Sequence, residues 1–253
     1  MMNNIVTGSV LGTQVAAVTK ENAAEIVIEW GQRGDRAYAI EAADVHVVTR
    51  ARHEDDFGKV MTKFDLICPD GMPVKWSLNK AVKKEDQIED RVSGAELMEE
   101  VFRQSAYHEG CSHFLLGGSD KLLDILPSII EEKCPGSRVA GVYSPPFGQW
   151  PEDEFERICQ KIKDSGAQHV WVGLGCPKQE RWIADHKEQL PPGCYYGVGA
   201  AFAFHAGMVP RAPMIFQKTG MEWFFRLCKE PRRLWKRYFT YNSLFIFYSF
   251  KKG

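Results

Sequence analysis

The chain has 253 residues, with 32 Lys and Arg against 33 Asp and Glu, so its formal net charge at pH 7 is −1. Hydrophobic residues make up 44%, enough for the core of one large domain or of a domain with an appendage. This composition excludes a disordered chain. The seven scattered cysteines form no CxxC pair, which excludes a disulfide framework and a cysteine-based zinc site and favours the reducing cytoplasm. We expect no signal peptide and no membrane-spanning segment.

The charge is unevenly distributed along the chain. Residues 211–253 carry ten Lys and Arg but only two Asp and Glu, whereas the rest carries 22 and 31. A basic tail on an acidic body indicates an anionic partner, either a membrane or a nucleic acid. Docking of this tail on the acidic body of the same chain is the alternative. We predict a catalytic domain at residues 1–208 and a basic amphipathic appendage at 209–253, because Pro210 and Pro213 coincide with the change in composition.

Apolar runs typical of strands alternate with helix-like stretches. The predicted helices cover residues 21–32, 46–57, 94–104 and 120–133, with another after Pro177. The predicted strands cover residues 37–43, 66–68, 113–116, 139–143, 169–172 and 195–196. This alternation predicts an α/β fold, with a Rossmann-like parallel sheet flanked by helices and a helical C-terminal appendage.

Glycine turns follow three of the predicted strands, at Gly117-Gly118, Gly173-Leu174-Gly175 and Gly197-Val198-Gly199. Open α/β sheets bind ligands where strands end and helices begin, and glycine lets a phosphate approach the backbone N–H groups. Lys178, in the turn after Gly175, suits a diphosphate. None of these turns is a full GxGxxG motif or P-loop, and close packing of strand on helix requires glycines too. Both interpretations stay open on spacing alone.

Several polar residues lie beside the predicted strand ends. Gln179 and Glu180 could bond a sugar hydroxyl or a base edge, although a first-turn Glu also complements the helix dipole without a ligand. Asp70, in a Pro-Asp-Gly turn, could be a general base, but that sequence is also a common turn. Asp44 and His46 follow the preceding strand, and for His46 we expect an ordinary surface histidine.

The tail combines basic and aromatic residues. Arg226, Arg233 and Arg237 recur at helical spacing, with Lys229, Arg232 and Lys236 nearby. Pro231 is expected to begin a second, short helix. Basic residues beside aromatic ones fit a helix that lies in a membrane interface. No nucleic-acid readout module is recognisable, so nucleic acid ranks below an anionic membrane as the partner.

Motifs over about residues 19–238 resemble the WecG/TagA/CpsF family of bacterial glycosyltransferases. The resemblance rests on CPDG (68–71), RVSGAELM (91–98), FLLGG (114–118), VGLGCPKQERW (172–182), GVG (197–199), GMEWFFRL (220–227) and EPRR (230–233). It implies an inverting transferase that moves a sugar from a UDP donor to an undecaprenyl-diphosphate-linked saccharide. Such an enzyme serves cell-surface polysaccharide and cell-wall biosynthesis as a peripheral protein on the cytoplasmic face of the membrane, and no metal cofactor is expected.

The resemblance also implies roles for individual residues. Asp70 matches the catalytic base, and the family's appendage is expected to close over the site and touch the lipid diphosphate. The expected donor-binding residues are Gly117, Gly118, Gly173, Gly175, Lys178, Gln179, Glu180 and Gly199. The residues expected at the acceptor or its diphosphate are Asp44, Arg91, Arg226, Arg232, Arg233 and Arg237.

Donor identity is the least determined expectation. Many family members have Thr-x-Asn where this chain has Ala42-Ala43-Asp44, so its specificity can differ. N-acetylmannosamine is the expected sugar because it is the commonest in the family, with glucose and N-acetylmannosaminuronic acid as alternatives. A nucleotide-binding membrane adaptor is the non-enzyme alternative, and Asp70 argues against it. A Rossmann dehydrogenase or methyltransferase is disfavoured because residues 37–44 contain no glycine turn. Homo-oligomerisation stays open.

Overall fold

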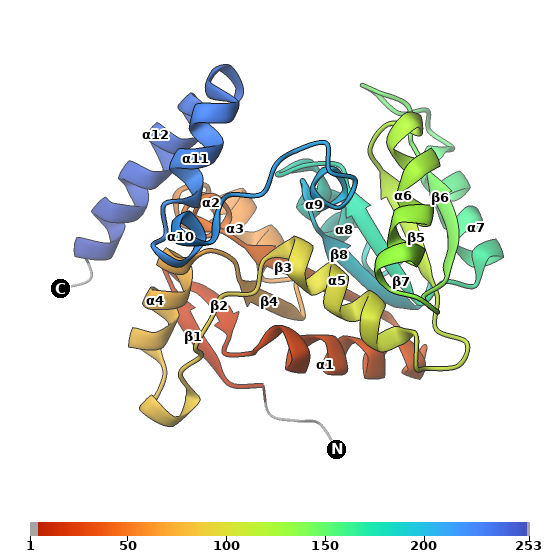
Figure 1. Ribbon diagram of the computed structural model, residues 1–253, viewed down its shortest axis with the longest axis horizontal. Helices are drawn as coiled ribbons and strands as arrows, with labels where there is room; N and C mark the ends of the chain where they lie inside the picture. The colour runs from red at the N-terminus through yellow and green to blue at the C-terminus, as the bar shows by residue number, and fades with distance from the viewer. Residues whose placement is uncertain (1–4, 252–253) are drawn as a thin grey trace. The chain divides into compact units, whose positions relative to one another are not determined.

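The computed structural model describes residues 5–251 (Figure 1). The chain divides into two compact units. The first unit comprises Met1–Thr19, Ala42–Ser93 and Arg211–Gly253, and the second comprises Lys20–Glu41 and Gly94–Pro210. The domain boundary expected at residues 208/209 stays a prediction.

The sheet confirms the predicted α/β fold. Six strands lie in the order β4-β3-β8-β7-β5-β6, and β3–β8, β8–β7, β7–β5 and β5–β6 pair in parallel. The strands are β3 (Ala37–Ala43), β4 (Leu66–Pro69), β5 (His113–Gly117), β6 (Val139–Tyr143), β7 (His169–Gly173) and β8 (Gly193–Gly197). Every residue of β4, β5 and β8 is buried, as expected for parallel strands covered on both faces. Because the strands run in one direction, the glycine turns after β5, β7 and β8 share one edge of the sheet.

The helices of the second unit follow the predicted alternation with strands. They are α1 (Lys20–Arg33), α5 (Gly94–Ser105), α6 (Asp120–Lys133), α7 (Glu154–Ser165), α8 (Lys178–His186) and α9 (Ala201–His205). Helices α1 and α5 lie side by side (Figure 1). Ser119 caps α6, as predicted, by accepting a hydrogen bond from the Leu122 N–H at 3.3 Å.

A buried histidine–aromatic cluster lies in the core of the second unit. Trp171 Nε1 donates to His113 Nδ1 at 3.1 Å, so His113 Nε2 carries the ring proton and donates to Ser105 Oγ at 2.7 Å. His169 Nδ1 lies 2.7 Å from the Tyr196 hydroxyl. Burial lowers the pKa of His169 to about 3 and that of His113 well below its usual value. Both rings are therefore neutral structural groups at neutral pH.

The first unit begins with a hairpin that the strand pattern did not predict. Strands β1 (Thr7–Val10) and β2 (Thr13–Ala16) pair antiparallel across Leu11 and Gly12. Both turn residues have positive φ, at 52° and 94°. Two positive φ values are the geometry of the type I′ turn, whose backbone twist matches that of the strands.

The remaining helices of the first unit correct two expectations. They are α2 (Val45–His53), α3 (Asp55–Met61), α4 (Met72–Ala81), the 3₁₀ turn η1 (Lys84–Asp86), α10 (Met214–Lys218), α11 (Glu222–Lys229) and α12 (Pro231–Phe250). The single helix predicted at residues 46–57 is wrong. It breaks at Glu54, which is extended and whose carboxylate bonds Arg50 and Tyr241. Pro231 does begin a helix, but α12 is 20 residues long rather than short.

Helix α12 packs along α2 within the first unit (Figure 1). The His46 and Tyr241 rings meet edge to face with centroids 4.4 Å apart, and the Tyr241 hydroxyl donates to Glu54 at 2.9 Å. Near the end of α12 the Tyr248 hydroxyl lies 2.9 Å from His53 Nδ1. Within residues 5–251, no helix combines the length and apolarity needed to cross a membrane.

Candidate active site

Asp70 directly follows β4 in the first unit, and its backbone is fixed on both sides. The Asp70 N–H donates to the Ala43 carbonyl at 3.1 Å, and the Val92 N–H donates to the Pro69 carbonyl at 2.8 Å. The turn continues through Gly71, whose φ of 82° disfavours any residue with a Cβ. The Asp70 side chain keeps 28% of its surface exposed. A fixed, partly exposed carboxylate at a strand end can accept a proton from a bound hydroxyl.

Arg91 lies beside Asp70 and links it to the C-terminal segment. Its Nη1 is 3.6 Å from Asp70 Oδ1. Its Nη2 donates to Gln217 Oε1 at 2.9 Å and lies 3.2 Å from Glu222 Oε2. The Arg91 side chain is only 6% exposed, so these groups supply the charge and hydrogen bonds that a buried guanidinium requires. The expected role of Arg91 at the acceptor stays a prediction, and sequence reasoning missed Gln217 and Glu222.

Asp44 and Arg237, both expected near the acceptor diphosphate, pair with each other. One Asp44 oxygen accepts from the Val47 N–H at 3.0 Å and caps α2, and the other lies 2.6 Å from Arg237 Nη2. Burial opposes ionisation of Asp44, but Arg237, His46 and the Val47 N–H together hold its pKa below its usual value. His46 is buried rather than a surface histidine as we expected, and burial beside Arg237 lowers its pKa to about 4.

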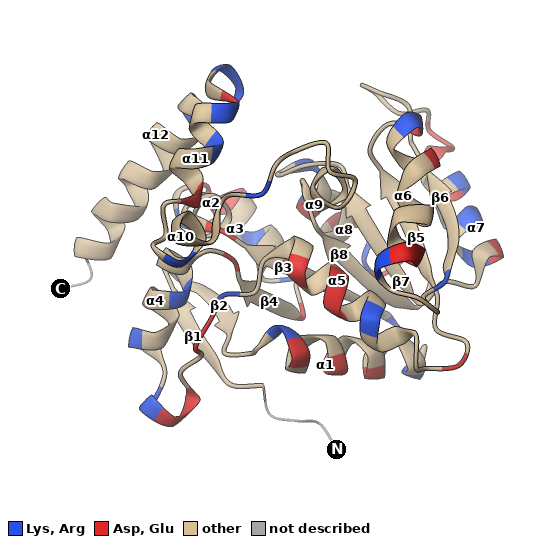
Figure 2. Cartoon of the chain, in the orientation of Figure 1, with Lys and Arg blue, Asp and Glu red and all other residues tan. Residues whose placement is uncertain are grey.

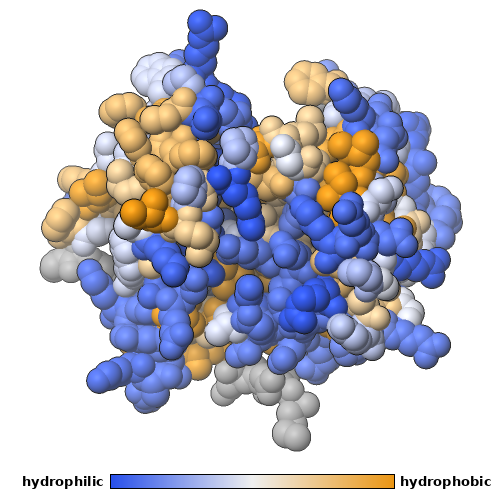
Figure 3. All heavy atoms as spheres, viewed as in Figure 1, coloured by the Kyte–Doolittle hydropathy of each residue, from blue (hydrophilic) through white to orange (hydrophobic). Residues whose placement is uncertain are grey.

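The other expected arginines gather at the turn between α11 and α12. Arg232 and Arg233 are exposed, Arg226 is half-buried, and Arg233 forms an ion pair with Glu230. Figure 2 shows Lys and Arg positions concentrated along the chain at this turn. Large apolar side chains are exposed on the same segment, and Figure 3 shows apolar residues gathered over α10, α11 and α12. They are Met214, Ile215, Met221, Phe224, Trp235, Phe239, Ile246, Phe247 and Phe250.

In the second unit, the glycine turns are closely packed against each other. A Cβ on Gly117 would lie 2.9 Å from the carbonyl group of Gly173, and its φ is 100°. Gly175 also has a positive φ, of 81°, but a Cβ there would meet nothing within 4 Å. Packing therefore explains Gly117, whereas Gly175 is explained by backbone conformation at an open position. Close packing and phosphate binding are compatible at this edge of the sheet.

Gln179 braces two of these turns. Its Oε1 accepts from the N–H groups of Gly175 at 3.1 Å and Gly199 at 3.0 Å, while its Nε2 donates to Glu180 Oε1 at 3.1 Å. Both side chains are buried, as is that of Glu41 within β3. The expected donor contacts of Gln179 and Glu180 stay predictions, and the observed contacts give Gln179 a structural role. Sequence reasoning missed Glu41. The one feature of the sequence that could have drawn attention to it is a carboxylate inside an otherwise apolar strand.

The loop after β6 borders the same turns and was not predicted as part of the site. The Ser144 hydroxyl donates to the Gly118 carbonyl at 2.8 Å, and Trp150 Nε1 donates to the Pro146 carbonyl at 2.9 Å. The Lys178 ammonium lies 4.3 Å from the centroid of the Trp150 ring. Lys178 is thus held by a cation–π contact at the rim of the glycine turns.

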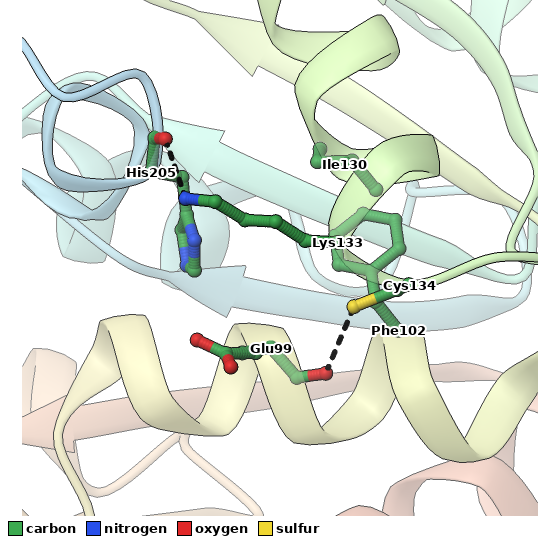
Figure 4. Close-up of a pocket in the computed structure, with 6 residues that line it drawn as sticks. All are labelled: Glu99, Phe102, Ile130, Lys133, Cys134 and His205. Carbon is green, nitrogen blue, oxygen red and sulfur yellow. Dashed lines mark hydrogen bonds between the residues drawn. The ribbon is translucent and has the colours of Figure 1, made fainter.

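A small cavity elsewhere in the second unit is unrelated to these turns. It lies between α5, α6 and α9 and has a volume of about 10 Å³, room for about one water molecule. Figure 4 shows Lys133 reaching across it, with Nζ 3.0 Å from the His205 carbonyl, and Cys134 against the Glu99 carbonyl. A sugar nucleotide cannot enter such a space. Nor do His, Cys, Asp or Glu side chains gather in threes suited to a metal ion anywhere in residues 5–251.

A comparison with known families accounts for the order of these motifs along the chain. The model of the glycosyl transferase WecG/TagA/CpsF family matches residues 8–253. The match covers both units and contains Asp70, Arg91, the glycine turns and the C-terminal helices. The chain therefore belongs to the WecG/TagA/CpsF family of glycosyltransferases, which use UDP-sugar donors and lipid-linked acceptors in polysaccharide and cell-wall biosynthesis.

Proposed function

We propose that this chain transfers N-acetylmannosamine from its UDP derivative to an undecaprenyl-diphosphate-linked saccharide, with inversion at the anomeric carbon. The choice of sugar rests on its frequency in the family. UDP-glucose and UDP-N-acetylmannosaminuronic acid are the competing donors, and Asp44, in place of the usual asparagine, is a reason to compare them directly.

In the proposed reaction, an acceptor hydroxyl oxygen attacks the anomeric carbon from the face opposite to UDP. Asp70 takes the hydroxyl proton as the new C–O bond forms. The bond from the anomeric carbon to the β-phosphate oxygen breaks, and its electron pair leaves with UDP. The observation that carries this role is the Asp70 carboxylate itself, fixed at a strand end, partly exposed and 3.6 Å from a buried guanidinium.

Charge on the leaving diphosphate is proposed to be stabilised by backbone N–H groups and cations. The turns at Gly117-Gly118 and Gly173–Gly175 supply N–H donors, and Lys178 supplies a positive charge at the same rim. Preorganised donors of this kind stabilise developing charge without reorganisation during the reaction. Arg226, Arg232 and Arg233 are the proposed cations for the acceptor diphosphate.

The C-terminal segment is proposed to hold the enzyme on an anionic membrane surface. Its exposed apolar side chains and exposed arginines occur on the same helices, which is the composition of interfacial segments. Each Lys or Arg near an anionic leaflet contributes about 1 kcal/mol, so a handful suffice for reversible binding. The proposed location is the cytoplasmic face of the plasma membrane.

A donor panel tests the function. The full chain is incubated with the three UDP-sugars and a polyprenyl-diphosphate-linked acceptor, with and without EDTA, and the product linkage is assigned by NMR. We expect transfer from one donor, an inverted linkage and no loss with EDTA. A retained configuration would contradict the single displacement. UDP binding without turnover from any donor would favour the membrane adaptor instead.

A further inference from the structure

The Arg91 contacts assign a role to two residues outside the proposed catalytic set. We propose that Glu222 and Gln217 are positioning residues, which hold the Arg91 guanidinium beside Asp70, so that Asp70 depends on α10 and the beginning of α11 to act as the base. The inference rests on the proposed function, since it requires Asp70 to be the base.

The backbone of Arg91 is fixed independently of the C-terminal segment. The Arg91 N–H donates to Asp90 Oδ1 at 2.8 Å, and the next residue, Val92, donates to the Pro69 carbonyl at the end of β4. The guanidinium then has one nitrogen toward Asp70 and the other toward α10 and α11. Its orientation is therefore set by partners that arrive about 120–130 residues later in the sequence.

Gln217 is itself held in the orientation that this role requires. Its Nε2 donates to the Ala212 carbonyl at 2.6 Å, so its Oε1 faces Arg91. The turn between α10 and α11 is also constrained. Gly220 has a φ of 74°, and a Cβ there would lie 3.1 Å from the Trp76 ring on α4. Glu222, two residues later, is therefore placed by packing as well as by its charge.

The distances indicate what the positioning achieves. Nη2 lies 3.2 Å from Glu222, whereas Nη1 lies 3.6 Å from Asp70, beyond a good hydrogen bond. By engaging Nη2, Glu222 and Gln217 fix the plane of the guanidinium, direct Nη1 toward Asp70 and keep the positive charge of Arg91 close to that carboxylate.

A simpler explanation exists for Glu222 alone. A carboxylate in a first helical turn is stabilised by the helix dipole without any partner. That explanation predicts that the effects of removing Glu222 and of altering Arg91 add, because the two act independently. The positioning role predicts that they do not add.

The test is a double-mutant cycle on the full chain, with the donor that the wild type uses. We expect Glu222→Gln to lower kcat by about tenfold or more, with the KM for the donor within about twofold of wild type. Glu222→Asp should recover part of the loss. In an Arg91→Lys background, Glu222→Gln should cause little further loss. Gln217→Met, which keeps the side-chain length, is a second variant in case Glu222→Gln destabilises the fold.

The control is Glu89→Gln, which removes an exposed carboxylate two residues before Arg91 and should leave kcat unchanged. Thermal unfolding and UDP binding establish that each variant is folded. Full additivity with Arg91→Lys, or wild-type kcat in folded Glu222→Gln and Gln217→Met, would overturn the positioning role. Asp70→Asn then separates two cases. If this variant also kept its turnover, the proposed function would fail. If it were inactive while the positioning role was contradicted, only the inference about Glu222 and Gln217 would fail.

Discussion

The two units use different chemistry at their candidate sites. In the second unit, the glycine turns are braced by backbone groups and by two neutral side chains, Gln179 and Ser144. In the first unit, Asp44 pairs with the distant Arg237, and Asp70 lies beside Arg91, which is itself contacted by C-terminal residues. A phosphate site built from backbone depends on close packing, whereas a site built from charged side chains depends on the docking of the C-terminal segment. The two sites should therefore respond differently to mutation and salt.

The largest effect is expected from Gly117→Ala in the second unit. The added Cβ would lie 2.9 Å from the Gly173 backbone at a φ of 100°, so one of the turns must move. We expect a loss of stability of about 3 kcal/mol and the loss of detectable UDP binding, measured by urea unfolding and calorimetry. The matched control is Gly166→Ala, which has a φ of 67° but open space around it, and should cost about 1 kcal/mol with unchanged UDP affinity.

Gln179→Met is expected to have the next largest effect. It keeps the volume but leaves two backbone N–H groups, of Gly175 and Gly199, without their acceptor. We expect a loss of about 2 kcal/mol in stability and a higher KM for the donor, with a smaller change in kcat. The control is Gln160→Met, which replaces an exposed glutamine on α7 whose side chain bonds Asp164. An unchanged KM in Gln179→Met would show that the brace is irrelevant to the donor.

Acid should destabilise both units through their buried histidines, of which His169 and His46 are the ones to test. The folded pKa is about 3 for His169 and about 4 for His46, against about 6.5 for an unfolded histidine. The free energy of unfolding that depends on these neutral rings is fully present above pH 6.5. It is lost as the pH falls toward the pKa values of the folded state, by about 2 kcal/mol for each histidine at pH 5. Urea unfolding of wild type, His46→Phe and His169→Phe between pH 8 and pH 5 checks this. If a variant lost as much stability between pH 8 and pH 5 as the wild type does, the role of the replaced histidine would be contradicted.

The Asp44–Arg237 ion pair should have the smallest effect. Both side chains are about 30% exposed, so solvent screens the pair, and we expect a coupling energy below about 1 kcal/mol. Asp44→Asn preserves the cap on α2, since asparagine is an equally good N-cap, and Arg237→Met keeps the apolar stem. A double-mutant cycle in urea at low and high salt measures the coupling. A value that salt does not reduce would mean that the pair is shielded from solvent.

Local sequence patterns were sufficient for much of the fold. The strand at residues 37–43 was predicted with its observed bounds, and the glycine turns, Asp70 and the cap at Ser119 were recognised from short-range signals. The hairpin was missed because its strands have only four residues each and its turn is Leu-Gly rather than the usual Asn-Gly.

The missed features depend on partners that are far away in sequence. The break at Glu54 is stabilised by Tyr241, and the orientation of Arg91 by Gln217 and Glu222. No periodicity or turn preference in one stretch reports a contact made almost 200 residues later. The residue types at the candidate site could therefore be predicted, but not which charges pair.

The most direct measurement of the central claim compares turnover with donor binding in Asp70→Asn. The account predicts that kcat falls about 10²–10⁴-fold, as for loss of a general base, while the affinity for UDP stays at the wild-type value. Asp55→Asn, which removes an exposed carboxylate in the same unit, should leave both unchanged. Near-normal kcat in a folded Asp70→Asn variant would contradict the assignment of Asp70 as the base.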